Sequence, residues 1–168
     1  MRLAPLLCLV VIADATNVNV TSIWTFKTKG RVWSSSAVSA NNGTIFVGSN
    51  DCDVYALDAS TGEQICAFKT GSAVESSPSI REDGTVYFAS WDGYVYAVDG
   101  ATGELVWKFA TDYAGHASDN TSPTQISSKP ALGTGETLYV TTPLSYVNGR
   151  LIQNVTLYSL KGSTGELL

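Results

Sequence analysis

The chain repeats one sequence pattern at a spacing of about 41 residues, and this repeat limits its fold more than any local pattern does. The clearest copy spans residues 93–107. It contains an apolar strand, a turn built on Asp99 and Gly103, and a second strand that ends in Trp107. A period near 40 residues indicates a repeat architecture, in which each unit needs a neighbour to bury its apolar face.

Two further copies lie on either side of this stretch. The earlier copy spans residues 53–66, and the later copy spans residues 155–168. A shift of 41 residues places residues 35–70 on residues 76–111, and 15 of the 36 positions are then identical without a gap. The repeat therefore covers whole units and not one short motif.

Each unit predicts four short antiparallel strands. Val, Ile, Tyr and Phe dominate the centres of these segments, and Asn42-Gly43 and Asp83-Gly84 are typical two-residue hairpin turns. Central stretches such as 45–47 and 86–88 are apolar on both faces, so each sheet must be covered on both sides. A sheet of this kind is typical of a β-propeller blade. The predicted strands are residues 36–40, 44–49, 53–59 and 63–70 in the first unit, and 77–81, 85–90, 93–100 and 104–111 in the second.

The third unit is irregular because it carries two insertions. Residues 129–132 and 137–140 match the first two strands after a shift of 52, and residues 158–160 match the third strand after a shift of 62. The extra residues lie in 112–128 and 141–154. Insertions in repeat proteins map to loops, often on the binding face, so we expect any partner-specific surface there.

These observations predict an all-β fold: a partial β-propeller with about two complete four-stranded antiparallel blades, an incomplete third blade and an orphan strand at residues 23–28. Known propellers close with about four to eight blades. We therefore expect a section of a longer propeller, and the alternative is a unit that needs other copies. The expected segments are a signal peptide at 1–15, a lead-in at 16–23, repeats at 24–168, and blades at about 34–70, 75–111 and 127–168.

The first residues have the layout of a secretory signal peptide. Arg2 precedes a short apolar run and Ala13-Asp14-Ala15, a small-x-small cleavage site. A buried N-terminal strand is the alternative interpretation. The apolar run is too short to cross a membrane, and no later segment is long enough. We expect a secreted or lumenal protein, or a periplasmic one if the source is bacterial.

Glycosylation and charge agree with this location. Four Asn-x-Ser/Thr sequons are candidate glycosylation sites in a eukaryotic source, at Asn19, Asn42, Asn120 and Asn154. The net charge of −5 is spread evenly along the chain. Nucleic acids and anionic membranes attract basic faces, so the composition argues against both as partners.

Cys52 and Cys66 remain after removal of the signal peptide, and an oxidising compartment would allow a disulfide between them. The predicted register opposes this bond. A hairpin that turns at Ser60-Thr61 places Cys66 opposite Tyr55, about 10 Å along the strand from Cys52 and beyond disulfide reach. A bent strand entry before Val54 would bring the two thiols closer. Otherwise they are separate small core residues.

No catalytic group stands out in the sequence. His116 is the single histidine, and with Asp112 and Asp119 it makes a poor metal-binding set that is more typical of a solvated loop. No general base is paired in the pattern with Ser34 to Ser36 or with Ser76-Ser77, so the sequence gives no support for nucleophilic catalysis. The sequence therefore predicts no catalytic, cofactor-binding or metal-binding residue in this chain.

Two stretches carry a resemblance to a known family. They are Ala56-x-Asp58-x-x-x-Gly62 and Ala97-x-Asp99-x-x-x-Gly103-Glu-x-x-Trp107. They resemble the docking motif of the quinoprotein, or pyrroloquinoline-quinone (PQQ), dehydrogenase-like β-propeller family, which is Ala-x-Asp-x-x-x-Gly-Lys-x-x-Trp. The resemblance covers residues 24–168 and is specific for the fold, while it says little about function.

The resemblance implies structural roles for the motif residues. The Asp is suited to accept hydrogen bonds from the turn amides, the Gly lets the chain reverse, and the Trp is expected to pack against the next blade. Cys66 stands at the Trp position of the first unit, which weakens the motif there. The residues in these roles are Asp58, Gly62, Asp99, Gly103, Trp24 and Trp107.

Family members with cofactor chemistry carry an adjacent Cys-Cys pair, an acidic base and calcium-binding carboxylates. This sequence has no adjacent cysteines and no matching acidic cluster. The expected function is therefore a non-catalytic binding scaffold, whose partner is a protein or the remaining propeller blades. The alternative is a fragment of a PQQ-dependent oxidoreductase whose active site, with PQQ and calcium, lies outside this chain. A sensor ectodomain is a third, weaker interpretation.

Overall fold

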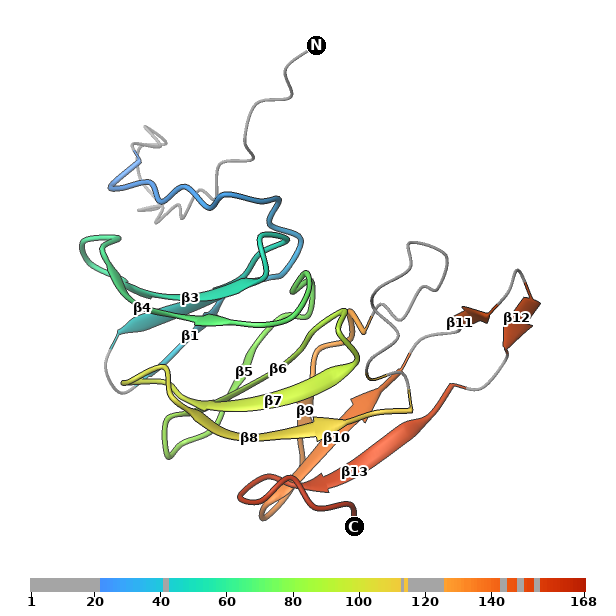
Figure 1. Cartoon of the computed structure of the whole chain (residues 1–168). Helices are drawn as coiled ribbons and strands as arrows, with labels where there is room; N and C mark the ends of the chain where they lie inside the picture. Colours follow the sequence, from blue (N-terminus) through green and yellow to red (C-terminus); the bar gives the residue numbers. More distant parts are fainter. Residues whose placement is uncertain are drawn as a thin grey trace, which may run out of the picture.

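The structure is a computed structural model. It describes residues 22–40, 43–112, 114, 126–142, 145–147, 150–152 and 155–168. Among these residues the regular structure is all strand. Figure 1 shows three antiparallel sheets that follow one another like the leaves of a fan, in the order of the chain. This arrangement confirms the predicted partial propeller.

Blades 1 and 2 each contain four strands in simple up-and-down order. In both, the innermost strand is shorter than predicted and pairs with its neighbour over two residues. Blade 1 comprises β1 (Ala37–Val38), β2 (Thr44–Gly48), β3 (Asp53–Asp58) and β4 (Gln64–Lys69). Blade 2 comprises β5 (Ser79–Ile80), β6 (Thr85–Ala89), β7 (Tyr94–Asp99) and β8 (Leu105–Ala110).

Blade 3 contains three strands among the described residues: β9 (Ala131–Leu132), β10 (Thr137–Thr141) and β13 (Leu157–Lys161). An isolated bridge between Leu160 and Leu167 marks the place where blades 1 and 2 begin their outer strand. The third blade is therefore incomplete, as predicted.

The second insertion corrects an expectation. Residues 141–154 were expected to form a loop, yet β11 (Ser145–Val147) and β12 (Arg150–Ile152) pair as an antiparallel hairpin. Figure 1 shows this hairpin extending beyond the ends of β10 and β13. Thr142 N donates to Thr156 O at 2.9 Å, as Ser90 N donates to Tyr94 O at 3.0 Å in blade 2, so the insertion starts from an ordinary strand end.

The core lies between the blades and not inside them. One apolar cluster joins blades 1 and 2, a second joins blades 2 and 3, and a third lies under residues 24–32 on the outer face of blade 1. This explains why central strands such as β3 and β7 are apolar on both faces, since each face belongs to a different cluster. The cluster between blades 1 and 2 contains Phe46, Val54, Ala56, Val74, Val86, Phe88, Tyr96 and Val98.

A bulge shifts the register of the outer hairpin in both complete blades. In blade 1 the shift lies between Ala56 and Leu57, and Leu57 pairs with Gln64 while Ala56 pairs with Cys66. Ile65 is thus the extra residue. The predicted pairing of Cys66 with Tyr55 was therefore wrong by one position, because a strictly regular hairpin had been assumed.

Candidate functional site

The Asp of the repeat motif organises the turn that precedes the outer strand. Asp58 Oδ1 accepts hydrogen bonds from the backbone N–H groups of Ser60 and Thr61 at 2.8 and 2.9 Å. Asp99 binds Ala101 and Thr102 in the same way at 2.9 and 2.8 Å. A hydrogen bond from the Ser60 hydroxyl at 2.5 Å, followed by the two backbone N–H groups, lowers the pKa of Asp58. The backbone N–H groups of Thr102 and Ala101 lower the pKa of Asp99, so both carboxyl groups stay ionised at neutral pH.

The motif glycine lies directly beneath an aromatic ring from the preceding unit. Gly62 has φ 74°, and a Cβ on it would overlap Cδ2 and Cε3 of Trp24. The Trp24 ring also donates its Nε1–H to Ala59 O at 3.0 Å. Glycine is needed at this position both for its backbone conformation and because no side chain fits under the ring.

The contact between blades 2 and 3 repeats this arrangement. Trp107 covers Gly165, where a Cβ would lie 2.6 Å from the ring, and donates Nε1–H to Gly162 O at 2.7 Å. The Tyr87 hydroxyl donates to the same carbonyl oxygen at 3.0 Å. One backbone carbonyl of blade 3 thus receives two donors from blade 2. The motif residues act here as a latch between blades.

The contact between blades 1 and 2 lacks this latch. Cys66 takes the place of tryptophan, and a Cβ on Gly103 would lie 3.0 Å from its Sγ. A pocket of about 190 Å³ lies beside this contact, and Phe46 and Gly100 are among its lining residues. A phenylalanine and a cysteine stand where blade 2 supplies Tyr87 and Trp107, so neither side-chain donor is present at this interface.

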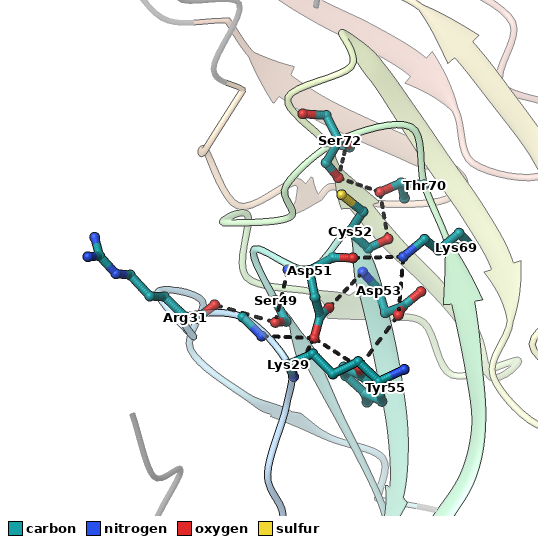
Figure 2. Close-up of polar contacts among 12 residues, drawn as sticks. Lys29, Arg31, Ser49, Asp51, Cys52, Asp53, Tyr55, Lys69, Thr70 and Ser72 are labelled. Carbon is teal, nitrogen blue, oxygen red and sulfur yellow. Dashed lines mark hydrogen bonds and ion pairs between the residues drawn. The ribbon is translucent and has the colours of Figure 1, made fainter. Parts of the chain in front are cut away.

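A second repeated network lies at the opposite ends of the same strands, and Figure 2 shows its copy in blade 1. Asp51 Oδ2 accepts hydrogen bonds from Lys29 N, Gly30 N and the Tyr55 hydroxyl at 2.8, 3.1 and 2.9 Å. Asp51 Oδ1 accepts from Asp53 N at 3.1 Å. We call this set the Asp–Tyr network. It ties the connection that follows one outer strand to the turn of the next blade.

Blade 2 repeats the Asp–Tyr network with the same atoms. Asp92 Oδ2 accepts from Gly71 N at 2.8 Å and from the Tyr96 hydroxyl at 2.6 Å. In blade 3 the hydroxyl of Tyr158 accepts from Asp112 N at 3.2 Å. The Asp–Tyr network was not predicted from the sequence. The signal was present, because Asp and Tyr recur at a spacing of four residues in both complete units.

The electrostatics of the network favour a structural role. Burial opposes ionisation of Asp51, but the hydrogen bonds from Tyr55, Lys29, Asp53 and Ser49 outweigh it and lower the pKa of Asp51. Burial, followed by the hydrogen bond to the neighbouring carboxylate, raises the pKa of Tyr55 and of Tyr96 well above the usual value. A general acid or base needs a pKa near neutrality, and these shifts move away from it.

Asn50 adds an open acceptor beside the network. Its Nδ2–H donates to Glu75 Oε1 at 3.1 Å, whereas its Oδ1 is buried and has no hydrogen-bond donor among the described residues. Buried polar atoms are nearly always paired, so such an atom marks a place where a water molecule or a ligand group would fit. It lies at the end of the blades from which both insertions start.

Both insertions start at the same end of the sheets, the first after β8 of blade 2 and the second after β10 of blade 3. The first begins at Asp112, whose backbone N–H contacts Tyr158 at the start of β13. The second leaves β10 after Thr141 and rejoins the sheet at Leu157, which is paired with Thr141. We call this end of the molecule the loop face. At this face the two insertions make blade 3 differ most from blades 1 and 2.

The inner strands border a shallow groove of about 490 Å³. Its lining comes from β1, β5 and β9, together with residues that precede β5 and β9, and is largely apolar with Lys129 as its one charged residue. Among the described residues, no pair of titratable groups meets in this lining. The lining residues are Ala37, Val38, Pro78, Ser79, Ile80, Lys129, Pro130, Ala131 and Leu132.

Both described cysteines are free thiols. Burial raises the pKa of Cys52 and of Cys66, so neither is an activated thiolate. Cys52 has φ 74°, and blade 2 has Gly93 with φ 85° at the equivalent position. Cysteine thus stands at a left-handed backbone position that favours glycine.

Several predicted sites lie outside the described residues. These are the signal peptide at 1–15, the four sequon asparagines Asn19, Asn42, Asn120 and Asn154, and the pair His116 and Asp119. Among the residues that are described, no three His, Cys, Asp or Glu side chains gather closely enough to share a metal ion. No described helix has the length and apolarity needed to cross a membrane.

The blades, the latch and the fan of sheets define a PQQ-type β-propeller repeat protein. A family model described as "Outer membrane protein assembly factor BamB" matches residues 12–168. The chain belongs to this family. The comparison with curated protein sequences returned no match.

Solved structures support the same fold. BamB from Moraxella catarrhalis superimposes with a TM-score of 0.65 at 19% identity, covering 88% of this chain and 40% of that one. Quinohemoprotein alcohol dehydrogenase from Comamonas testosteroni gives a TM-score of 0.61 at 21% identity, covering 82% of this chain and 20% of that one. The computationally designed Ika8 protein gives 0.65 at 16% identity, with 90% and 40% coverage. The chain thus spans less than half the length of these three proteins.

Proposed function

We propose that this chain is a non-catalytic binding scaffold and forms one section of a larger β-propeller. It would act in a secretory compartment or outside the cell, or in the periplasm of a bacterium. The observation that carries the proposal is the position of the two insertions. They start at the loop face, after β8 of blade 2 and after β10 of blade 3, whereas the repeated residues of the motif and of the network are engaged in blade-to-blade contacts.

A protein is the favoured partner. The family model is described as an assembly factor, which supports a role in holding other proteins. The β11–β12 hairpin supplies two backbone edges and lies apart from the blade contacts. The open acceptor of Asn50 adds a polar point at the same end of the blades. Such a surface suits strand-like or loop contacts with a protein.

The proposal is tested by replacing residues 143–155 with Trp91-Asp92-Gly93, the tripeptide that connects the equivalent strands of blade 2. Partners are then identified by chemical cross-linking and mass spectrometry in the source cells. We expect the variant to keep its far-ultraviolet circular dichroism and lose the cross-linked protein. The matched control, Cys52→Gly, alters the equivalent turn of blade 1 without changing Asn50 and should retain the partner. Equal cross-linking by both variants would contradict the proposal.

A fragment of a PQQ-dependent oxidoreductase is the second candidate. The likeness to a quinohemoprotein alcohol dehydrogenase favours it, at the level of the fold. Addition of PQQ and calcium to the complete propeller from the source organism separates the two candidates. The scaffold proposal expects no change in PQQ absorbance and no reduction of an artificial electron acceptor. Binding of PQQ with dye reduction would overturn it.

A further inference from the structure

A third side chain, besides the tryptophan and the tyrosine, distinguishes the contact between blades 2 and 3 from the contact between blades 1 and 2. In blade 2, Arg81 N donates to Thr85 O at 2.9 Å where the first hairpin turns. Ser39 N makes the same bond to Thr44 O at 2.8 Å in blade 1, so Ser39 is the structural counterpart of Arg81. The turn of blade 1 is one residue longer, which moves this counterpart one position from the one that the ungapped repeat indicates.

Arg81 places its guanidinium between blades 2 and 3. The Nη2–H group donates to Gly135 O at 2.9 Å, and the Nη1–H group donates to the Tyr87 hydroxyl at 3.4 Å. A Cβ on Gly162 would lie 2.7 Å from the same Nη1, so the guanidinium covers this glycine. The side chain of Arg81 is only 20% exposed. The guanidinium therefore fills a site built from two turns of blade 3 and one tyrosine of blade 2.

The equivalent site between blades 1 and 2 has no such side chain among the described residues. Ser39 is too short to reach across, and the pocket of about 190 Å³ lies at this place. An apolar cavity of about 150 Å³ admits benzene, so the pocket has room for a guanidinium group. Four residues of its lining, Ser39, Phe46, Asp83 and Gly100, are the counterparts of Arg81, Tyr87, Gly135 and Gly162 at the filled site.

The charge of the pocket suits a cation. At the filled site, Lys161 directly precedes Gly162, whereas the counterpart of Lys161 in the pocket lining is Asp99. Asp83 supplies a second carboxylate. The described lining contains no basic residue, and Arg81, whose Nε lies 3.9 Å from Asp83 Oδ2, has its guanidinium engaged with blade 3. The pocket thus combines the shape of a guanidinium site with two carboxylates and no cation of its own.

We propose that this pocket binds the arginine side chain of a partner protein, in the place that Arg81 fills between blades 2 and 3. Arginine suits the pocket better than lysine, because a planar guanidinium donates in several directions at once, here toward backbone carbonyls and two carboxylates. Asp99 and Ala101 are exposed, so the pocket reaches the surface.

The pocket is separate from the loop face. It adjoins the turn between β5 and β6 and the turn between β7 and β8, which lie at the opposite end of the sheets. A protein held there is therefore held without the insertions. The choice of a protein as the source of the arginine rests on the proposed scaffold function, whereas the guanidinium chemistry of the pocket does not.

Binding is tested with acetyl-arginine-amide as the probe, on the complete propeller from the source organism with isotope-labelled glycine. The matched probe, acetyl-citrulline-amide, has a neutral urea group in place of the guanidinium. We expect millimolar arginine probe to shift the amide resonances of Gly84 and Gly100 to saturation, and to leave Gly162, whose site Arg81 fills, unchanged. No shifts at Gly84 and Gly100, or equal shifts with the citrulline probe, would overturn the proposal.

Ser39→Arg tests the site itself. This variant supplies a guanidinium from the chain's own blade 1, so the arginine probe should no longer shift Gly84 and Gly100. Ala110→Arg is the matched control, because it adds the same charge to an exposed residue of β8 at the other end of the sheet, and it should keep the shifts. Retained shifts in Ser39→Arg, with its remaining glycine resonances in place, would overturn the assignment.

The carboxylates give a graded readout. Asp83 Oδ1 accepts from Thr85 N at 2.9 Å, and Asp83→Asn keeps an acceptor for this bond while it removes the charge. The Asp83 side chain is 58% exposed, so the affinity for the arginine probe should fall about two- to fivefold, as for a surface ion pair. An unchanged affinity would contradict an ionic contact between Asp83 and the probe.

Cross-linking in the source cells tests whether the arginine belongs to a protein. We expect Ser39→Arg to lose a cross-linked protein that Ala110→Arg retains. If the probe binds but no protein is lost, the pocket takes a free guanidinium compound, and the protein partner is rejected. The variant that replaces residues 143–155 should keep the probe shifts at Gly84 and Gly100, so failure at the pocket and failure at the loop face are distinguishable.

Discussion

Cys52 occupies a backbone conformation that its counterpart in blade 2 meets with glycine. A left-handed φ costs a residue with a Cβ about 1–2 kcal/mol, and glycine at position 52 would remove this cost from the folded state. Part of the gain is offset, because glycine gives the unfolded chain more conformational entropy. Cys52→Gly is therefore expected to raise the free energy of unfolding by about 0.5–1 kcal/mol. Urea unfolding measures this change. The reciprocal Gly93→Ala variant should lower stability, and a destabilised Cys52→Gly variant would contradict the argument.

The Asp–Tyr network makes stability depend on pH at the acid end. The folded-state pKa of Asp51 lies below its ordinary value, so the stabilisation it provides is complete above about pH 4 and is lost as pH falls through the folded pKa. Asp51→Asn should remove this contribution. Urea unfolding from neutral to acid pH should show that the free energy of unfolding differs between the unaltered chain and the Asp51→Asn variant. This difference should narrow below about pH 4. A difference that stays constant with pH would count against the network.

At the level of whole elements, the latch predicts a graded response at Trp107. Trp107→Phe loses the indole hydrogen bond to Gly162 O, which is worth about 1 kcal/mol. Trp107→Ala also removes the ring from the interface between blades 2 and 3, and the expected loss is about 3–5 kcal/mol. Thermal or urea unfolding provides the measurement. Similar losses for the two variants would show that the ring does not pack as described.

The repeat made most elements predictable. The centres of β2, β3, β6 and β7 were identified because apolar residues recur at a fixed spacing in two units. The bulge at Ile65 was not identified, because it occurs in both complete units and leaves their alignment without a gap. The β11–β12 hairpin was not identified either, although the sequence has Asn148-Gly149, a typical two-residue hairpin turn, between its two strands.

The candidate site was predictable to a smaller degree. The motif pointed to Asp58, Gly62 and Trp107 because a known pattern names them, and the structure gives their contacts. An Asp and a Tyr recur at the same positions in both complete units. The sequence alone does not show that Asp51 accepts hydrogen bonds from the backbone of Lys29 and Gly30, which lie far before it in the chain. Bonds between a turn and a distant connection depend on how blades are placed against each other.

At the scale of the whole molecule, stability is a sum of contacts between neighbouring blades. The interface between blades 1 and 2 lacks the tryptophan latch, and the outer face of blade 3 has no covering blade among the described residues. Cys66→Trp should restore the first latch, since a pocket of about 190 Å³ lies beside it and Gly100 O stands where the other latches have their acceptor. A rise in thermal stability is expected, and a fall would show that the pocket cannot admit the ring.

The central claim is that an outer-strand tryptophan packs over a turn glycine at two blade contacts, Trp24 on Gly62 and Trp107 on Gly165, and that the contact between blades 1 and 2 has cysteine in its place. Nuclear magnetic resonance tests it most directly, through the α-proton shifts of three equivalent glycines. The protons of Gly62 and Gly165 lie under Trp24 and Trp107 and should be shifted upfield by the ring currents, whereas those of Gly103, beside Cys66, should not. Ordinary shifts at Gly62 and Gly165 would contradict the account.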